Sequence, residues 1–305
     1  MKTTIRLLFI TLLLSTSLPL YAANKALLIG VGEYLGEKDD LEGPAYDVPA
    51  IKKTLINHWG FKADNIKTLL GYDATKKNIL EALTSLKNNA KAGDQILFYY
   101  SGHGTSLHDK SLRLPLPDSS GALIPHDFSK NGTAQEKLKQ LIIGKTDLKP
   151  ILLALDKTGA QTFVIFDTCY SGNTVRGLYS TTKGLRSRDM PTGLDMPDDD
   201  YDDEEVTTYT PVAQNKQTPY PYNNIFFLSA ANAREKAVDI GKHSIPQYPT
   251  IDGNPHGAFT NVLLLALSGK INTDLNNDGK LNYAELHGAI KDKMKNVTGG
   301  LNLPF

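Results

Sequence analysis

The sequence predicts one α/β domain in which helices flank a mostly parallel central sheet. Short apolar runs of strand length alternate with longer segments of helical periodicity through the first half of the chain, which is the pattern of a parallel sheet covered by helices. The length of 305 residues suits one large domain or two small ones. Because the alternation resumes after a polar interruption, we expect one interrupted fold rather than two independent domains.

Residues 1–23 are predicted to be a secretory signal peptide. Lys2 and Arg6 give a basic start, the apolar run LLFITLLL follows, and small residues near Ala22 and Ala23 suit cleavage. The apolar run is too short to span a bilayer, and no later run reaches the necessary length. We therefore expect an exported protein, periplasmic or secreted, with no transmembrane segment in the mature chain.

Four strands are predicted in the first half of the chain, and a fifth follows the polar interruption. The segments between them carry apolar residues at i, i+3 and i+4 spacing, which predicts helices. The expected strands span residues 25–32, 65–70, 94–100, 161–167 and 223–231, and the expected helices span residues 45–60, 74–90, 145–159 and 257–269.

The alternation stops between residues 177 and 222, where Pro, Gly, Thr and acidic residues dominate. Residues 195–205, DMPDDDYDDEE, form an acidic run with no basic stretch to match it. This composition predicts a long exposed linker or inserted loop that is partly disordered.

The charge is balanced, with 33 Lys and Arg against 33 Asp and Glu. A net charge of zero gives no sign of a basic face, so we expect no nucleic-acid partner. Cys169 is the one cysteine, and it therefore has no partner for a disulfide within the chain. A single cysteine can serve as a small buried hydrophobic residue, form an intermolecular disulfide or act as a reactive thiol.

Two glycine-flanked motifs end predicted strands: YYSGHG carries His103, and FDTCYSG carries Cys169. Open α/β sheets bind ligands at the carboxyl ends of their strands, where these two side chains face each other if the strands are neighbours. An imidazole beside a thiol takes its proton and stabilises the thiolate. We expect Cys169 to be a nucleophile, His103 its general base and acid, and the amides of Gly104 and Cys169 an oxyanion hole. The alternative is a buried thiol with a separate surface histidine.

These motifs resemble those of caspase-like cysteine peptidases, in particular the metacaspases and related prokaryotic proteins. The segments LIGVGEY, LEGPAYDV, NIFFLSAANAREKA and GAFTNVLLLAL extend the resemblance over nearly the whole mature chain. The Gln-Ala-Cys pattern of caspases is absent, which argues against cleavage after aspartate. The resemblance implies a single caspase-like (caspase-hemoglobinase) domain over residues 24–298, with a large-subunit-like part at 24–176, the linker at 177–222, a small-subunit-like part at 223–298 and a tail at 299–305.

The resemblance also implies a pocket that receives an Arg or Lys side chain before the scissile bond. The matching positions are Asp47, Ser101 and Asp167, while Ser229 would border the substrate strand. Two carboxylates in one pocket favour a cation, because a buried unpaired charge is costly. The alternative is that Asp47 caps its helix and Asp167 bonds loop amides.

Together these features predict an exported cysteine endopeptidase that hydrolyses polypeptides after Arg or Lys through a His-Cys dyad. The segment after Cys169 carries the same cationic residue types, so we expect self-cleavage there, after Lys183, Arg186 or Arg188. The competing hypothesis is a catalytically weak or inactive scaffold that serves as a calcium- or partner-binding module. Tyr170, where metacaspases often have histidine, is a small departure from the family pattern.

The segment DLNNDGKLNYAE, residues 274–285, matches an EF-hand calcium loop at every required position. Side-chain oxygens are expected from Asp274, Asn276 and Asp278, a backbone carbonyl from Lys280, and a bidentate carboxylate from Glu285. EF-hands usually occur in pairs, and loops of this composition also form plain turns, so a simple turn is the alternative.

Metacaspases often have a separate calcium site built from acids after the loop that contains LIPHDF. This chain has Asp127 there, but it has Asp147 alone where a pair of adjacent acids is expected. We therefore expect catalysis to require no cofactor.

Overall fold

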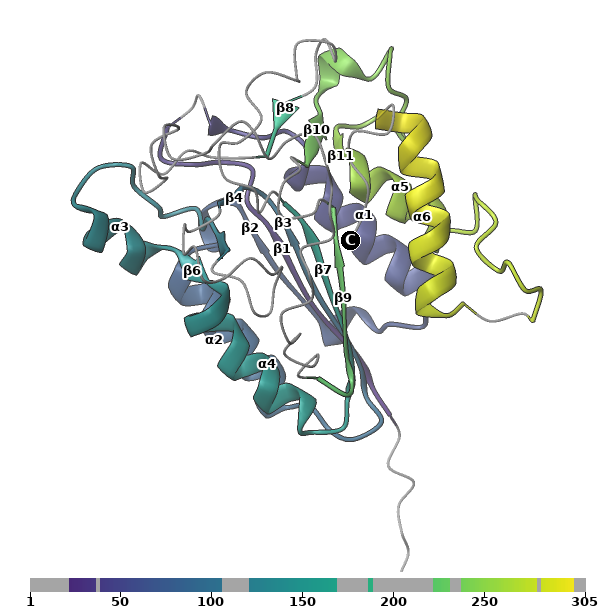
Figure 1. The fold of residues 1–305 in the computed structure, drawn as a ribbon, viewed down its shortest axis with the longest axis horizontal. Helices are drawn as coiled ribbons and strands as arrows, with labels where there is room; N and C mark the ends of the chain where they lie inside the picture. Colours follow the sequence, from purple (N-terminus) through teal and green to yellow (C-terminus); the bar gives the residue numbers. More distant parts are fainter. Residues whose placement is uncertain are drawn as a thin grey trace, which may run out of the picture.

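The structure is a computed structural model that describes residues 22–36, 39–105, 121–168, 186–188, 222–230, 237–278 and 281–298 (Figure 1). Cys169, Lys280, the predicted signal peptide up to residue 21, most of the predicted linker and the predicted tail lie outside these residues. Within the described part, no helix is both long and apolar enough to cross a membrane.

The centre of the fold is a five-stranded parallel sheet, as the sequence predicts. Its strands pair in parallel and lie side by side in Figure 1. In sheet order they are β2 (Ile66–Leu70), β1 (Asn24–Gly30), β3 (Gln95–Ser101), β7 (Gln161–Asp167) and β9 (Ile225–Ser229). β3 and β7 are neighbours, so the two predicted catalytic motifs follow adjacent strand ends.

Helices cover both faces of this sheet (Figure 1). One layer comprises α1 (Pro44–His58), α5 (Ala258–Leu267) and α6 (Tyr283–Thr298), and the opposite layer comprises α2 (Lys76–Asn88) and α4 (Lys149–Asp156). Burial on both faces explains why the central strands β1, β3 and β7 are nearly continuous apolar runs rather than alternating ones.

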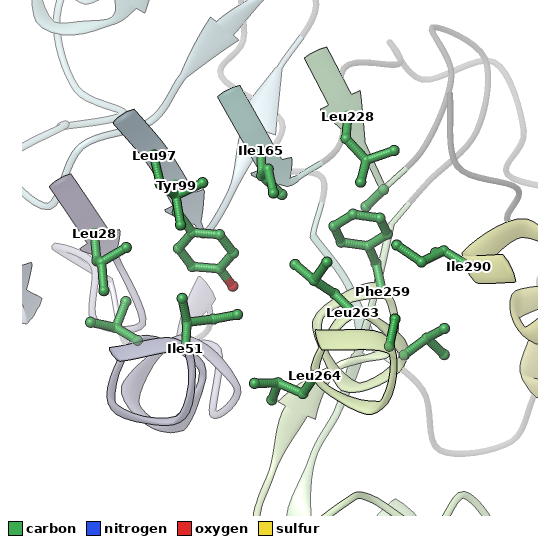
Figure 2. Close-up of a cluster of buried hydrophobic side chains, with 14 of the residues drawn as sticks. Leu28, Ile51, Leu97, Tyr99, Ile165, Leu228, Phe259, Leu263, Leu264 and Ile290 are labelled. Atoms are coloured by element: carbon green, nitrogen blue, oxygen red, sulfur yellow. The ribbon is translucent and has the colours of Figure 1, made fainter. Parts of the chain in front are cut away.

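The two large clusters of the core lie on opposite sides of the sheet. On the first side, Leu28, Leu97, Ile165 and Leu228 point from the strands toward α1, α5 and α6 (Figure 2). On the second side, neighbouring strand residues such as Phe98 pack toward α2 and α4. This alternation along each strand decides which face of the sheet each side chain covers.

Two small three-stranded sheets lie beside the central one. The first joins β4 (Gly104–Thr105), β5 (Ala122–Leu123) and β6 (Ile142–Ile143), and the second joins β11 (His256–Gly257), β10 (Val238–Ile240) and β8 (Arg186–Ser187). The remaining elements are α3 (Ala134–Gln140), 3₁₀ turns at Ala63–Asn65, Gly71–Asp73 and Lys242–Ser244, and a π-helical turn at Gly144–Leu148.

β8 belongs to the segment predicted to be an exposed linker. Arg188, directly after it, is fully buried, so the prediction of exposure is wrong at this residue. The composition of the segment predicts its average exposure, whereas the burial of a single arginine among carboxylates depends on tertiary contacts.

Candidate active site

His103 follows β3 and is held from both sides by backbone and ring contacts. Its Nε2 lies 2.6 Å from the carbonyl oxygen of Asp39, and its ring lies 4.8 Å from that of Tyr34, centroid to centroid. The Tyr34 hydroxyl accepts the His103 backbone N–H at 2.7 Å and donates to Val31. Since a carbonyl can only accept, Nε2 carries the proton, and Nδ1 is left as the basic nitrogen.

The imidazole of His103 is held in its neutral form. Burial lowers its pKa to about 4, with the carbonyls of Arg188 and Asp39 opposing part of that shift. Nδ1 is buried and has no hydrogen-bond partner among the described residues. At neutral pH the ring is therefore neutral, with a free lone pair at the edge of the sheet.

The register of the sheet brings the two motifs together. Ser101 on β3 is paired with Asp167 on β7, so His103 and Cys169 each follow a member of this pair by two residues. The described range 121–168 ends at Thr168, which is buried. Cys169 itself lies outside the described residues.

A pocket at this edge encloses the guanidinium of Arg188. Nη1 donates to the Ser101 hydroxyl at 2.7 Å and to the Asp167 carbonyl at 2.8 Å. Nη2 donates to carboxylate oxygens of Asp47 at 3.0 Å and Asp239 at 2.7 Å. The Asp167 carboxylate lies 3.3 Å from Nη1, so three carboxylates surround one cation.

Each acid of this pocket comes from a different element. Asp47 lies in the first turn of α1 but caps no helix amide, so the helix-capping alternative is wrong. Asp167 ends β7, and its Oδ2 also accepts from the backbone and hydroxyl of Thr260 at the start of α5. Asp239, on β10, accepts from the amides of Glu42 and Gly43 through its other oxygen.

Two glycines make room for the guanidinium. A Cβ on Gly43 would stand 2.6 Å from Nη2 of Arg188, and a Cβ on Gly257 would stand 2.7 Å from it. The Gly257 Cβ would also overlap the Asp167 carboxylate. Any side chain at these positions would close the pocket.

The backbone around Arg188 is held as an extended strand. β8 pairs antiparallel with β10, and the Arg188 N–H donates to the Ala237 carbonyl at 3.0 Å. The Arg188 carbonyl accepts from the Gly104 N–H at 3.2 Å, the amide predicted for the oxyanion hole. The segment therefore has the Arg188 side chain in an acidic pocket and the Arg188 carbonyl on an amide donor beside His103.

Burial and mutual repulsion set the ionisation of the pocket. Burial raises the pKa of Asp167 to about 6 against the opposing effect of Arg188, and burial likewise raises the pKa of Asp239. For Asp47, burial is outweighed by the hydrogen bond from His256 and the charge of Arg188, so its pKa is lowered. The pKa of Arg188 is raised because the three carboxylates outweigh its burial.

Four pocket residues were not predicted from the sequence: Asp239, His256, Gly43 and Gly257. Asp239 lies between Val238 and Ile240, in a strand too short to give a periodic signal. Ser229 ends β9 opposite Phe166, whereas the extended segment 186–188 pairs with β10. The predicted role of Ser229 stays a prediction.

In the predicted calcium loop, the described side chains form hydrogen bonds with the backbone of the loop itself. The Glu285 carboxylate accepts from the amides of Asn276 and Asn282, and Asp278 N–H lies within hydrogen-bonding distance of Asp274 and Asn276 oxygens. Among the described residues, no three His, Cys, Asp or Glu side chains converge as a metal site. Lys280 lies outside those residues, and calcium binding stays a prediction.

Lys76 lies between the two acids considered for a separate calcium site. Its ammonium contacts Asp147 at 3.2 Å and the carbonyls of Lys139 and Leu141 at 3.0 and 2.6 Å. Its backbone N–H donates to Asp127. A side-chain cation thus supplies positive charge to this cluster of oxygens.

The model of the family described as "Metacaspase, peptidase C14 domain" matches residues 24–177, about half of the chain. The chain belongs to the metacaspase family. Among its relatives, Metacaspase-1 of Lodderomyces elongisporus is 33% identical over 179 residues, which are 53% of this chain and 36% of the relative. Metacaspase-6 of Arabidopsis thaliana is 32% identical over 158 residues, 50% of this chain and 39% of the relative.

The match therefore spans less than half the length of these curated metacaspases. The fold is also similar to a crystal structure of a protein from Geobacter sulfurreducens, with a TM-score of 0.56 and 20% identity over 93% of this chain and 92% of that one. The predicted membership of the metacaspase branch and the caspase-like α/β fold are confirmed.

Proposed function

We propose that this metacaspase is a cysteine endopeptidase that cleaves polypeptides after arginine and, more weakly, after lysine. One observation carries the proposal: Arg188 lies with its guanidinium among three carboxylates and its carbonyl on the Gly104 amide. This is the arrangement that an endopeptidase needs for the residue before the scissile bond. Membership of the peptidase family supports the same chemistry.

The chemistry assigns one step to each predicted residue. The Cys169 thiol gives its proton to Nδ1 of His103, and the sulfur attacks the carbonyl carbon of the arginine. The oxygen of the tetrahedral intermediate becomes negative and is stabilised by the Gly104 N–H, with the Cys169 N–H as the second predicted donor. His103 then protonates the leaving amine, and water hydrolyses the thioester with His103 as base.

The pocket favours arginine over lysine. The two terminal nitrogens of the guanidinium bond separate partners, Ser101 and the Asp167 carbonyl on one side and Asp47 and Asp239 on the other. A lysine ammonium has a single nitrogen and cannot span both sides at once. We therefore expect lysine substrates to be cleaved more slowly, with the difference mainly in KM.

The same geometry supports self-cleavage after Arg188. Of the three candidate residues, Lys183 lies outside the described residues, and Arg186 lies in β8 opposite Asp239 in the register. Arg188 alone is described in the pocket. While the bond to residue 189 is intact, this arginine also blocks the pocket against other substrates.

Two variants and an inactive control test the proposal. Purified wild-type protein should yield fragments that end at Arg188, whereas Cys169→Ala should yield none; fragments in both would identify a contaminating protease. Arg188→Ala should lose this cut, while Arg186→Ala should keep it. A cut that survives Arg188→Ala at an unchanged position, or no cut in active wild-type protein, would refute self-cleavage after Arg188.

The competing hypothesis, an inactive scaffold, predicts a thiol of ordinary reactivity. Alkylation of Cys169 by iodoacetamide near neutral pH should be fast and should slow in His103→Ala, because the thiolate loses its partner. Equal rates in the two proteins, without peptide hydrolysis, would support the scaffold instead.

Export and calcium binding belong to the proposal as well. A basic start, an apolar run and small residues before residue 24 support export by a cleaved signal. The EF-hand spacing of residues 274–285 supports a structural calcium ion held by Asp274, Asn276, Asp278, Lys280 and Glu285. Lys76 supports catalysis without a metal, since its ammonium neutralises the Asp147 cluster.

A further inference from the structure

His256 is a fully buried imidazole between two carboxylates, one in the pocket and one near the surface. Nδ1 lies 2.8 Å from Oδ1 of Asp47, and Nε2 lies 3.0 Å from Oδ1 of Asp252. Asp252 is partly exposed, with a side-chain exposure of 42%. A neutral imidazole can donate to only one of these oxygens, whereas the imidazolium donates to both.

Asp47 shares its carboxylate between His256 and Arg188. Oδ1 faces His256 and the Gly257 amide, and Oδ2 faces the Ser101 hydroxyl and Arg188. The hydrogen bond from His256 fixes the plane of this carboxylate. That plane decides whether Oδ2 points at the arginine.

We propose that His256 is a positioning residue of the arginine pocket, whose imidazolium aims Asp47 at the guanidinium and by its charge opposes guanidinium binding. The affinity for an arginine side chain then rises when His256 loses its proton. This inference rests on the proposed function, because it concerns the same pocket. It adds a pH-dependent control that the pocket acids alone do not contain.

The sign follows from the charges around the ring. The described groups that face it are Asp47 from α1 and Asp252 from its own loop, and beyond Asp47 lie Asp167, Asp239 and Arg188. Two cations on one carboxylate repel each other, so binding of the arginine must favour release of the His256 proton. By reciprocity, release of that proton must tighten binding of the arginine.

The ionisation of His256 agrees with this geometry. Burial alone would lower its pKa, but the hydrogen bond and charge of Asp47, together with Asp252, raise it above the usual value. The proton is therefore retained to a higher pH than on an ordinary imidazole, and it is lost as the pH rises through that raised pKa. Loss of the proton should lower KM for arginine substrates in the same interval.

Two substitutions separate positioning from charge. His256→Asn places an amide N–H near the position of Nδ1, so it keeps a donor to Asp47 without a titrating charge. His256→Ala removes both the donor and the charge. The kinetic constants kcat and KM of both variants and of the wild type are measured with an arginine peptide from pH 5 to pH 9.

His256→Asn should lower KM at acid pH, by roughly fivefold for a modest coupling between sites, and should converge with the wild type at alkaline pH. His256→Ala should raise KM at every pH. A variant that binds better at acid pH is a result that damage to the fold does not produce. The carboxylates Asp167 and Asp239 also titrate, but they do so in all three proteins.

Proton counting gives a second readout. In Arg188→Ala protein, whose pocket is free, agmatine serves as a small guanidinium probe, and calorimetry in two buffers counts the protons released on binding. Addition of His256→Asn should reduce that count by up to one. Parallel pH profiles of KM for the wild type and His256→Asn, with equal proton release on agmatine binding, would overturn the role of His256. Failure of the wild type to cleave arginine peptides, with no agmatine binding at any pH, would instead overturn the proposed function.

Discussion

Asp239 offers the sharpest test of the pocket, because its contribution is not implied by the catalytic motifs. Its Oδ1 accepts from Nη2 of Arg188 at 2.7 Å, and its Oδ2 accepts from the amides of Glu42 and Gly43 at 3.1 Å. Asp239→Asn retains one acceptor oxygen and nearly the same volume. The substitution therefore removes the negative charge and turns an NH₂ group toward one of these donors.

The magnitude follows from the contacts that are lost and those that remain. A hydrogen bond to a charged group contributes about 1.5–3 kcal/mol, and removal of one partner of a buried ion pair costs about 3–5 kcal/mol. The upper range is not reached, because Asp47 and Asp167 still neutralise the guanidinium. A loss of about 2 kcal/mol corresponds to a decrease of about 30-fold in kcat/KM for arginine peptides.

The assay compares peptides that differ only before the scissile bond, one with arginine and one with citrulline, its neutral isostere. Asp239→Asn should reduce hydrolysis of the arginine peptide and leave that of the citrulline peptide nearly unchanged. Asp64→Asn, an exposed acid before β2, is the matched control and should affect neither. A loss below threefold, or an equal loss for both peptides, would refute the assignment of Asp239 to the pocket.

Three further predictions concern the pocket wall, the catalytic imidazole and the calcium loop. Gly257→Ala should raise KM for arginine peptides at least tenfold, because its Cβ would overlap the Asp167 carboxylate. Gly288→Ala, in α6, is the control, because its Cβ would meet only Leu275 Cδ1, at 4.0 Å, and an equal effect would contradict the reasoning. The pKa of His103 is lowered to about 4 in the folded protein, so between pH 6.5 and pH 4 the unfolded chain binds a proton that the folded chain does not. The free energy of unfolding should therefore decrease by about 3 kcal/mol as the pH falls from 6.5 to 4. Denaturant unfolding of His103→Gln should show a smaller decrease in the free energy of unfolding over this pH interval than the wild type. The control His58→Gln, at an exposed site, should show the same decrease as the wild type. Millimolar Ca²⁺ should raise Tm, and Glu285→Gln should remove most of that rise; a Tm indifferent to Ca²⁺ would mean that residues 274–285 form a plain turn.

Much of this architecture was predictable because its signals are periodic. The three central strands β1, β3 and β7 are nearly continuous apolar runs buried on both faces, and helical spacing marks α1, α2 and α5. His103 and the acid Asp167 were found because they end such strands. The hydrophobic pattern shows where a strand ends, and ligand-binding sites of open α/β sheets form at the carboxyl ends of the parallel strands.

The missed features are those that leave no local pattern. Any residue offers a carbonyl, so nothing in the sequence marks Asp39 as the partner of His103. β10 has three residues, too few for a periodic signal, and Asp239 on it was overlooked for that reason. Arg188 lies in a polar segment, and its burial depends on carboxylates distant in the sequence.

The occupied pocket has a consequence for how such an enzyme becomes active. Arg188 belongs to the same chain as the catalytic residues, and a tethered group competes at an effective concentration in the millimolar range. On the proposed function, an external peptide therefore meets a blocked pocket until the bond after Arg188 is cut. Cleavage alone does not clear the site, because the guanidinium keeps its contacts with Asp47, Asp167 and Asp239. The cut removes the covalent tether to residue 189, so activation depends on release of Arg188 as well as on hydrolysis.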